Sequence, residues 1–224
     1  MTIEEEIFKK SKLNEDKILK YGFKKEKDFF IIYKDIMNNC MKVEIKIDKD
    51  KNVVAKVIDK DFNEEYTAFR NNEKEGSFSG KVKEEFEKVL IDIRESCSKK
   101  ENFVFEQSNR LEKYIKEKYN DLPTFEWETS PDFGVFRNKN TEKWYALLMN
   151  IDMSKLDKTK AGNIEIVNIK LDKNEIIDLL QKEGFYPAWH MNKKYWISIT
   201  LNDIVDDKLL FKLVDESYSY SEKK

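Results

Sequence analysis

Hydrophobic side chains at every second position are the feature of this sequence that most limits its fold. The alternation runs through two segments, whose apolar positions are Val43, Ile45, Ile47, Val53, Ala55 and Val57. A period of two places successive side chains on opposite faces of a strand, so each strand buries one face. Together with a strand candidate at 28–36, which contains the apolar run 29–33, and short polar turns, this pattern predicts an antiparallel meander.

Segments with a helical period lie on either side of these strands. Thr2-x-x-Glu5 is a capping box, which predicts a helix at the start of the chain. A second helix, predicted to pack on the sheet, carries the stripe Val82, Phe86, Val89, Leu90, Ile93 and Cys97.

The second half of the chain follows a similar plan. We expect a helix at 111–119, strands near 133–137, 143–149, 164–171 and 195–201, a helix from Asp172 to about Lys182 stopped by Gly184, and a closing helix over 204–214. The predicted class is therefore α+β, with antiparallel sheets and helices packed on one face.

A polar segment at 96–102 separates the two halves, which we interpret as an N-terminal α+β region, 1–100, and a second domain, 101–224. The first carries 23 basic and 22 acidic residues, and the second 19 and 22. Neither is a basic domain, so charge alone does not favour binding to nucleic acid.

Residue usage argues against several classes of protein. One histidine and two isolated cysteines, Cys40 and Cys97, leave no histidine-rich or Cys-x-x-Cys metal pattern, and we expect neither a metal nor a cofactor. No Gly-x-Ser-x-Gly elbow or other nucleophile motif is present, so we do not expect an enzyme. The longest apolar runs, 29–33 and 144–149, fall short of the ~18–20 residues of a membrane span. With an acidic N-terminus that lacks a signal segment, the chain is expected to be cytoplasmic.

One segment near the C-terminus resembles a known family. Its core is His190-Met191-Asn192-Lys193 followed by Trp196. Supporting pieces are Lys143-Trp144-Tyr145-Ala146-Leu147, Asp207, Leu210 and Ser217-Tyr218. Over about 103–220 the chain resembles the MmcQ/YjbR family, and its first half is similar to an extra region of longer members. Tyr195, in place of a second histidine, and Asn202-Asp203, in place of Asp-Gly, depart from the family pattern.

The resemblance implies a CyaY-like fold for the second half and binding of double-stranded DNA through a double wing. The candidate contacts in the first wing are Trp189, His190, Asn192, Lys193 and Lys194. Those in the second wing are Arg137, Lys139 and Lys143. The lysines would contact phosphates, Asn192 would hydrogen-bond a base edge, and Trp189 would stack on or wedge against a base. Lysines of the loop 152–162 (Lys155, Lys158 and Lys160) are further candidates, partly offset by Asp152 and Asp157.

Two other interpretations stay open. In the first, 186–196 is an ordinary loop in which His190 bonds a backbone carbonyl, Asn192 caps a turn and Trp196 faces the core. In the second, the aromatic segment 185–196 is the contact surface of a protein-binding adaptor or chaperone-like module.

Overall fold

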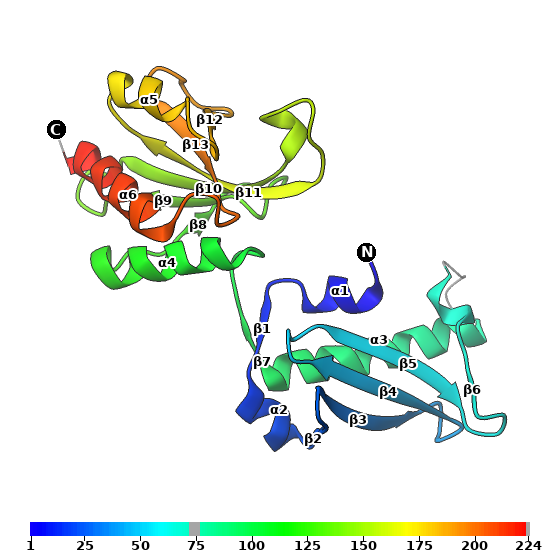
Figure 1. The fold of residues 1–224 in the computed structure, drawn as a ribbon. Coiled ribbons are helices and arrows are strands. Elements are labelled where there is room, and N and C mark those ends of the chain that lie inside the picture. Colours follow the sequence, from blue (N-terminus) through cyan, green and yellow to red (C-terminus); the bar gives the residue numbers. More distant parts are fainter. Residues whose placement is uncertain (72–76, 223–224) are drawn as a thin grey trace. The chain divides into compact units, whose positions relative to one another are not determined.

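The chain divides into two compact units, Met1–Glu101 and Asn102–Lys224 (Figure 1). The computed structural model describes residues 1–71 and 77–222. The boundary between the units falls inside the polar segment 96–102. Each unit has its own hydrophobic core and is described by itself.

The N-terminal unit combines an antiparallel sheet, a small two-stranded ribbon and helices. Its elements are α1 (Ile3–Phe8), β1 (Ser11–Leu13), α2 (Glu15–Tyr21), β2 (Lys24–Lys25), β3 (Phe29–Ile36), β4 (Met41–Asp48), β5 (Val53–Asp59), β6 (Glu64–Glu65), the 3-10 helix η1 (Ala68–Arg70), α3 (Phe78–Cys97) and β7 (Ser98–Lys100). The sheet has the order β2-β3-β4-β5-β6, and β1 pairs with β7. The predicted meander and the capping box at Thr2 are confirmed.

Burial in this sheet follows the alternation of the sequence. On β4, Val43, Ile45 and Ile47 are fully buried, whereas Glu44 and Lys46 lie on the other face and form an ion pair at 2.9 Å. Helix α3 contributes Phe86 and Leu90 among the buried residues of the same core. The predicted helical stripe is thus the face that packs on the sheet.

The C-terminal unit is also an antiparallel sheet with helices. Its elements are α4 (Glu106–Tyr119), β8 (Thr124–Phe125), β9 (Gly134–Arg137), β10 (Trp144–Asp152), the 3-10 helix η2 (Met153–Lys155), β11 (Asn163–Lys170), α5 (Lys173–Leu179), β12 (Phe185–Pro187), β13 (Trp196–Thr200) and α6 (Asp207–Glu222). The strand order is β12-β13-β11-β10-β9-β8.

The two faces of this second sheet are covered differently. One face carries residues such as Leu148, Val167 and Ile199, which pack with α4, α5 and α6 in one core cluster. The opposite face carries Leu147 and Ile166, and its partly buried neighbours come from loops, from Trp144 on β10, from the N-cap of α4 and from the 3-10 helix η2. We call this opposite face the helix-free face, because no residue inside an α-helix of the described chain belongs to its cluster. The expected α+β class, with helices packed on one face of an antiparallel sheet, is confirmed.

Helix boundaries differ from the prediction in α4, α5 and α6. Helix α4 begins at Glu106 instead of near 111, and α6 continues to Glu222 instead of ending near 214. Helix α5 ends at Leu179, and Gly184 instead opens β12, with a φ of +87°. The closing helix begins only at Asp207, because the side chain of Asp206 accepts the N–H of Leu209 and so caps it. No helix in the described part of the chain combines the length and apolar composition needed to cross a membrane.

Candidate nucleic-acid interface

The loop between β12 and β13, residues 188–195, lies on the helix-free face. Trp189 and Met191 from this loop pack against the cluster that contains Leu147 and Ile166. Ala188, which precedes them, is fully buried. The first part of the loop is therefore anchored to the sheet, while residues 192–195 are exposed.

Hydrogen bonds from two neighbouring strands hold the backbone at Trp189. Its N–H donates to Ser198 Oγ on β13 (3.0 Å), and the Ser198 hydroxyl donates to Asn168 Oδ1 on β11 (2.5 Å). Asn168 Nδ2 in turn donates to the carbonyl oxygen of Trp189 (2.7 Å), so the three residues form a closed ring of hydrogen bonds. Asn168 and Ser198 are fully buried, so both backbone groups of Trp189 are satisfied by side chains that the sheet itself positions.

The ring of Trp189 belongs to a run of aromatic contacts on this face. It meets Phe133 edge to face with centroids 6.2 Å apart, and Phe133 meets Trp127 in the same way. Trp127 in turn contacts Trp144 at 5.8 Å. Trp189 is thus an anchor residue, half-buried among other rings, rather than a ring that projects freely toward a base.

His190 and Asn192 form the turn that follows. His190 is exposed, has a left-handed φ of +59° and places its ring 3.8 Å from that of Trp189. The expected bond from His190 to a backbone carbonyl is not found among the described residues. Asn192 is a turn cap, because its Oδ1 accepts the N–H of Lys194 at 3.0 Å and its carbonyl accepts those of Tyr195 and Trp196.

Lys193 and Lys194 stand at the exposed end of the loop. Within residues 1–71 and 77–222, neither ammonium group has a carboxylate at ion-pair distance. Lys194 Nζ lies 5.0 Å from the centre of the Tyr195 ring. These are uncompensated positive charges on a loop with a fixed base.

The residues expected in a second wing are engaged elsewhere. Arg137 donates to Glu126 at 2.5 Å and stacks over Trp144. Lys139 donates to the carbonyl oxygen of Asn120 and forms an ion pair with the buried carboxylate of Asp121 at 3.3 Å. Lys143, which precedes β10, also has an interaction partner in the protein. The wing predicted from Arg137, Lys139 and Lys143 therefore lacks the free cations of the first loop.

A different basic loop approaches the first one. The segment 153–162 packs Met153 and Leu156 on the helix-free face. Its Lys160 lies 3.5 Å from the hydroxyl of Tyr186, on the strand that leads into the 188–195 loop. Lys160 is also 4.0 Å from Asp157, which offsets part of its charge.

Trp196 is half-buried and is not one of the residues in the hydrophobic clusters of the described chain. Its neighbours Ile197 and Ile199 are fully buried on the helix-covered side. Strand alternation therefore directs Trp196 to the helix-free face. The ordinary-loop interpretation places Trp196 toward the core, but Trp196 does not belong to the helix-covered core.

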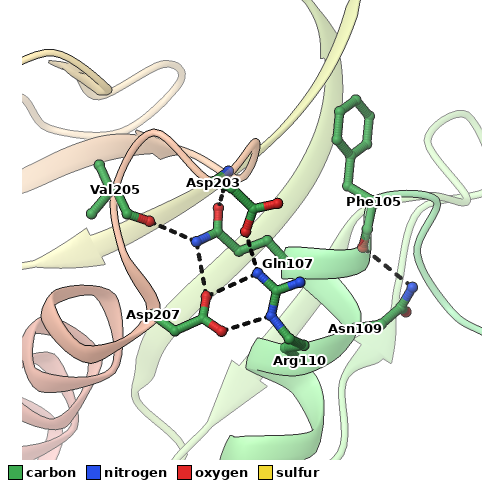
Figure 2. A network of polar contacts seen from close by, with 7 residues as sticks. All are labelled: Phe105, Gln107, Asn109, Arg110, Asp203, Val205 and Asp207. Atoms are coloured by element: carbon green, nitrogen blue, oxygen red, sulfur yellow. Dashed lines mark hydrogen bonds and ion pairs between the residues drawn. The ribbon is translucent and has the colours of Figure 1, made fainter.

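A polar network joins α4 to the loop before α6, and sequence reasoning missed it (Figure 2). Buried Gln107 donates to the carbonyl oxygen of Val205 (2.7 Å) and accepts the N–H of Asp203 (2.8 Å). Arg110 binds Asp207 through Nε at 2.6 Å and also contacts Asp203. Hydrogen bonding to Arg110 holds the pKa of Asp207 below its usual range. The network fixes the loop that contains Asn202 and Asp203.

The residues missed at the site itself are Asn168 and Ser198. The available signal was a polar residue among apolar neighbours, as in Val167-Asn168-Ile169 and Ile197-Ser198-Ile199. A buried polar side chain needs a partner, but the sequence does not say which one.

Comparison with known proteins assigns the C-terminal region. A family model described as YjbR matches residues 116–220. The uncharacterized protein YyaQ of Bacillus subtilis (strain 168) is 36% identical over 107 residues, which are 47% of this chain and 90% of that protein.

Solved structures are also similar to about half of this chain. A protein from Pseudomonas syringae, known from a crystal structure, is 34% identical in sequence. The match covers 50% of this chain and 97% of that protein's chain, with a TM-score of 0.49. A crystal structure from Deinococcus radiodurans is 26% identical, covers 52% and 79% of the two chains, and has a TM-score of 0.41. The match to the YjbR model and to YyaQ means that this chain belongs to the YjbR family.

Proposed function

We propose that the protein is a non-enzymatic binder of double-stranded DNA and that the loop 188–195 supplies its main contacts. The observation that carries the proposal is that Lys193 and Lys194 are exposed and have no ion-pair partners among the described residues. They stand on a loop whose base is fixed by the hydrogen bonds of Trp189 with Ser198 and Asn168. Cations that are not paired within the protein are the ones that can neutralise phosphates and release counterions.

The fixed base of the loop lowers the entropic cost of binding. A flexible loop would lose conformational freedom when it docks on DNA, and part of the binding energy would be spent on ordering it. Here Trp189 is already held from both its N–H and its carbonyl group. His190 and the Nδ2 group of Asn192 then stand beside the lysines as contacts for a groove.

The second set of contacts is proposed at the loop 153–162. Lys155 and Lys158 are exposed, and neither has an ion-pair partner in the ranges that the structure describes. The contact of Lys160 with Tyr186 brings this loop next to the β12 edge. We favour these lysines over Arg137 and Lys139, whose ion pairs with Glu126 and Asp121 would have to break first.

Fluorescence anisotropy with a labelled duplex, at two salt concentrations, tests the proposal. Binding no tighter than ~100 µM at low salt, the weak end of nonspecific binding, would end it. If binding occurs, Lys193→Ala and Lys194→Ala should each reduce the slope of log K against log salt by about 1. Lys173→Ala and Lys182→Ala, exposed lysines at α5, are the matched controls and should leave the slope unchanged.

A protein partner is the second candidate function. It is favoured by the exposed ring of Tyr195, 41% accessible, in the same loop as Trp189, which belongs to the half-buried aromatic run of the helix-free face. Aromatic residues with a fixed geometry are typical interface anchors. Tyr195→Ala should abolish capture of such a partner without affecting the anchored Trp189, and a duplex competitor should not displace it. Capture that survives Tyr195→Ala would count against this candidate.

A further inference from the structure

A hollow of about 470 Å³ opens in the N-terminal unit, where the ends of α1 and α3 meet the β1–β7 ribbon. Its lining includes Lys9, Ser11, Arg94, Glu95, Ser98 and Lys100. The volume lies within the range of about 300–1,000 Å³ that small-molecule sites occupy. These residues lie outside 116–220, the part matched by the family model.

The hollow concentrates positive charge in a chain whose net charge is −2. Lys9, Arg94 and Lys100 face one carboxylate, Glu95, which is 3.2 Å from Arg94. In the described chain, neither Lys9 nor Lys100 has a carboxylate within ion-pair distance. Lys10 also lines the hollow, but the surplus of about two positive charges does not depend on it.

The walls of the hollow are held by regular structure. Ser11 pairs with Lys100 across the β1–β7 ribbon, and Leu13 pairs with Ser98. The N–H of Glu101 donates to the carbonyl oxygen of Lys10 at 2.9 Å, which closes the end of the ribbon. Because side chains alternate along a strand, Ser11 and Lys100 project to the same side as Leu13 and Ser98.

The cations are not needed to cap the end of α3. The carbonyl oxygen of Arg94 accepts the N–H of Ser98 and also its hydroxyl, at 2.5 Å. The carbonyl oxygen of Cys97 accepts the N–H of Asn14 at 2.9 Å. The carbonyl oxygens of Arg94 and Cys97 are therefore satisfied by donors other than the cations of the hollow, and the carbonyl oxygen of Ser98 is bound by Lys17 at 3.1 Å.

We propose that this hollow binds the phosphate group of a small phosphorylated molecule. A phosphate monoester carries about −1.5 to −2 charges at neutral pH, which matches the surplus in the hollow. Lys9, Arg94 and Lys100 supply the charge, and the Ser11 hydroxyl supplies a further donor. A concave wall with a net positive charge strengthens the field that an anion meets there.

Isothermal titration of the full chain with inorganic phosphate and with methyl phosphate tests the site. We expect saturable binding of both, with a Kd near or below about 1 mM. The double variant Lys9→Gln/Lys100→Gln should weaken binding by about tenfold, because two partly exposed ion pairs are lost. Lys49→Gln/Lys81→Gln, exposed lysines of the same unit, is the matched control and should bind as the wild type does.

Other outcomes would overturn the proposal. They are the absence of saturable binding of either anion up to about 10 mM, equal weakening in both double variants, or binding of an oligonucleotide with no binding of methyl phosphate. The last result would assign the cations to nucleic-acid backbone instead of a small molecule. Lys193→Ala/Lys194→Ala should leave methyl phosphate binding unchanged, so this test and that of DNA binding fail independently.

Discussion

The backbone N–H of Trp189 donates to the hydroxyl of Ser198, nine residues further along the chain, at 3.0 Å. Ser198 lies in the middle of β13, and its hydroxyl passes the interaction on to Asn168. The loop with the exposed lysines is therefore held by buried groups of the sheet. Its position follows from strand pairing between β11 and β13, in which Asn168 stands opposite Ser198.

Removal of the Ser198 hydroxyl should destabilise the C-terminal unit. In Ser198→Ala, the N–H of Trp189 and the Oδ1 of Asn168 lose their partner in a buried site, which costs about 1–3 kcal/mol of unfolding free energy. Urea denaturation followed by tryptophan fluorescence measures the loss. Ser219→Ala, on the exposed side of α6, is the control and should change stability by less than about 0.5 kcal/mol. Equal stability of Ser198→Ala and wild type would mean that the hydrogen bonds among Trp189, Ser198 and Asn168 do not hold the loop.

The network of α4 allows a comparison between a buried amide and a partly exposed ion pair. Gln107→Ala leaves the carbonyl oxygen of Val205 and the N–H of Asp203 without their partner, and should cost about 1–3 kcal/mol. Arg110→Ala should cost less, about 1 kcal/mol or below, because the side chain of Arg110 is 40% exposed. Urea denaturation at low and high salt separates the two effects. The loss of unfolding free energy in Arg110→Ala should be smaller at high salt, because salt screens the ion pair, whereas the loss in Gln107→Ala should not change. A larger loss for Arg110→Ala would reverse this ranking.

A buried carboxylate at the start of α4 provides a third test. Both oxygens of Glu165 are used, by the N–H of Val104 at 2.8 Å and by that of Phe105 at 2.9 Å. Glu165→Gln replaces one acceptor with an NH₂ group that faces a backbone donor, and should cost about 2 kcal/mol. Thermal unfolding with circular dichroism measures the change. Glu183→Gln, at an exposed position, should leave the midpoint unchanged.

The stability of the C-terminal unit should fall as the pH rises through neutrality. Partial burial, with the hydrogen bond to Glu216 and the charge of that residue, raises the pKa of Glu175 to about 7, against the opposing effect of Lys212. Because the folded state holds the proton more tightly than the unfolded chain does, the stabilisation is complete below about pH 4.5 and is lost as the pH passes about 7.

The predicted loss is small, below about 1 kcal/mol, because the site is accessible to solvent. Urea midpoints at about pH 5 and about pH 8 should differ in the wild type and differ less in Glu175→Gln. Asp207 and Asp215 do not contribute in this window, because their pKa values are lowered and their effect falls at acidic pH. A wild type with the same midpoint at both pH values would contradict the prediction.

Hydrophobic periodicity predicted the framework well. The alternation at Val43, Ile45 and Ile47 became β4, and the stripe through Phe86 and Leu90 became the buried face of α3. Short elements such as β1, β7 and β8 were not predicted, because two or three residues carry no measurable period. Strands β1 and β7 depend on each other across most of the N-terminal unit, and β8 depends on pairing with β9.

The candidate site was predicted in part. The segment with His190, Asn192 and Lys193 was singled out from its resemblance to a family, and the turn cap at Asn192 followed from loop chemistry. Trp189 was expected to contact a ligand, but its ring packs among Phe133 and other aromatic residues. The sequence contains no information on which rings meet, because those contacts join separate strands and loops.

Local patterns in the sequence by themselves determined the class of fold, the capping of α1 and the buried faces of the main strands, since each depends on residues a few positions apart. Tertiary structure alone decided which lysines remain free. Arg137 and Lys139 are paired with Glu126 and Asp121, more than ten residues away, whereas Lys193 and Lys194 find no such acid in the described chain. The physical reason is that charge compensation depends on distance in space, and only folding brings those groups within a few ångströms of each other.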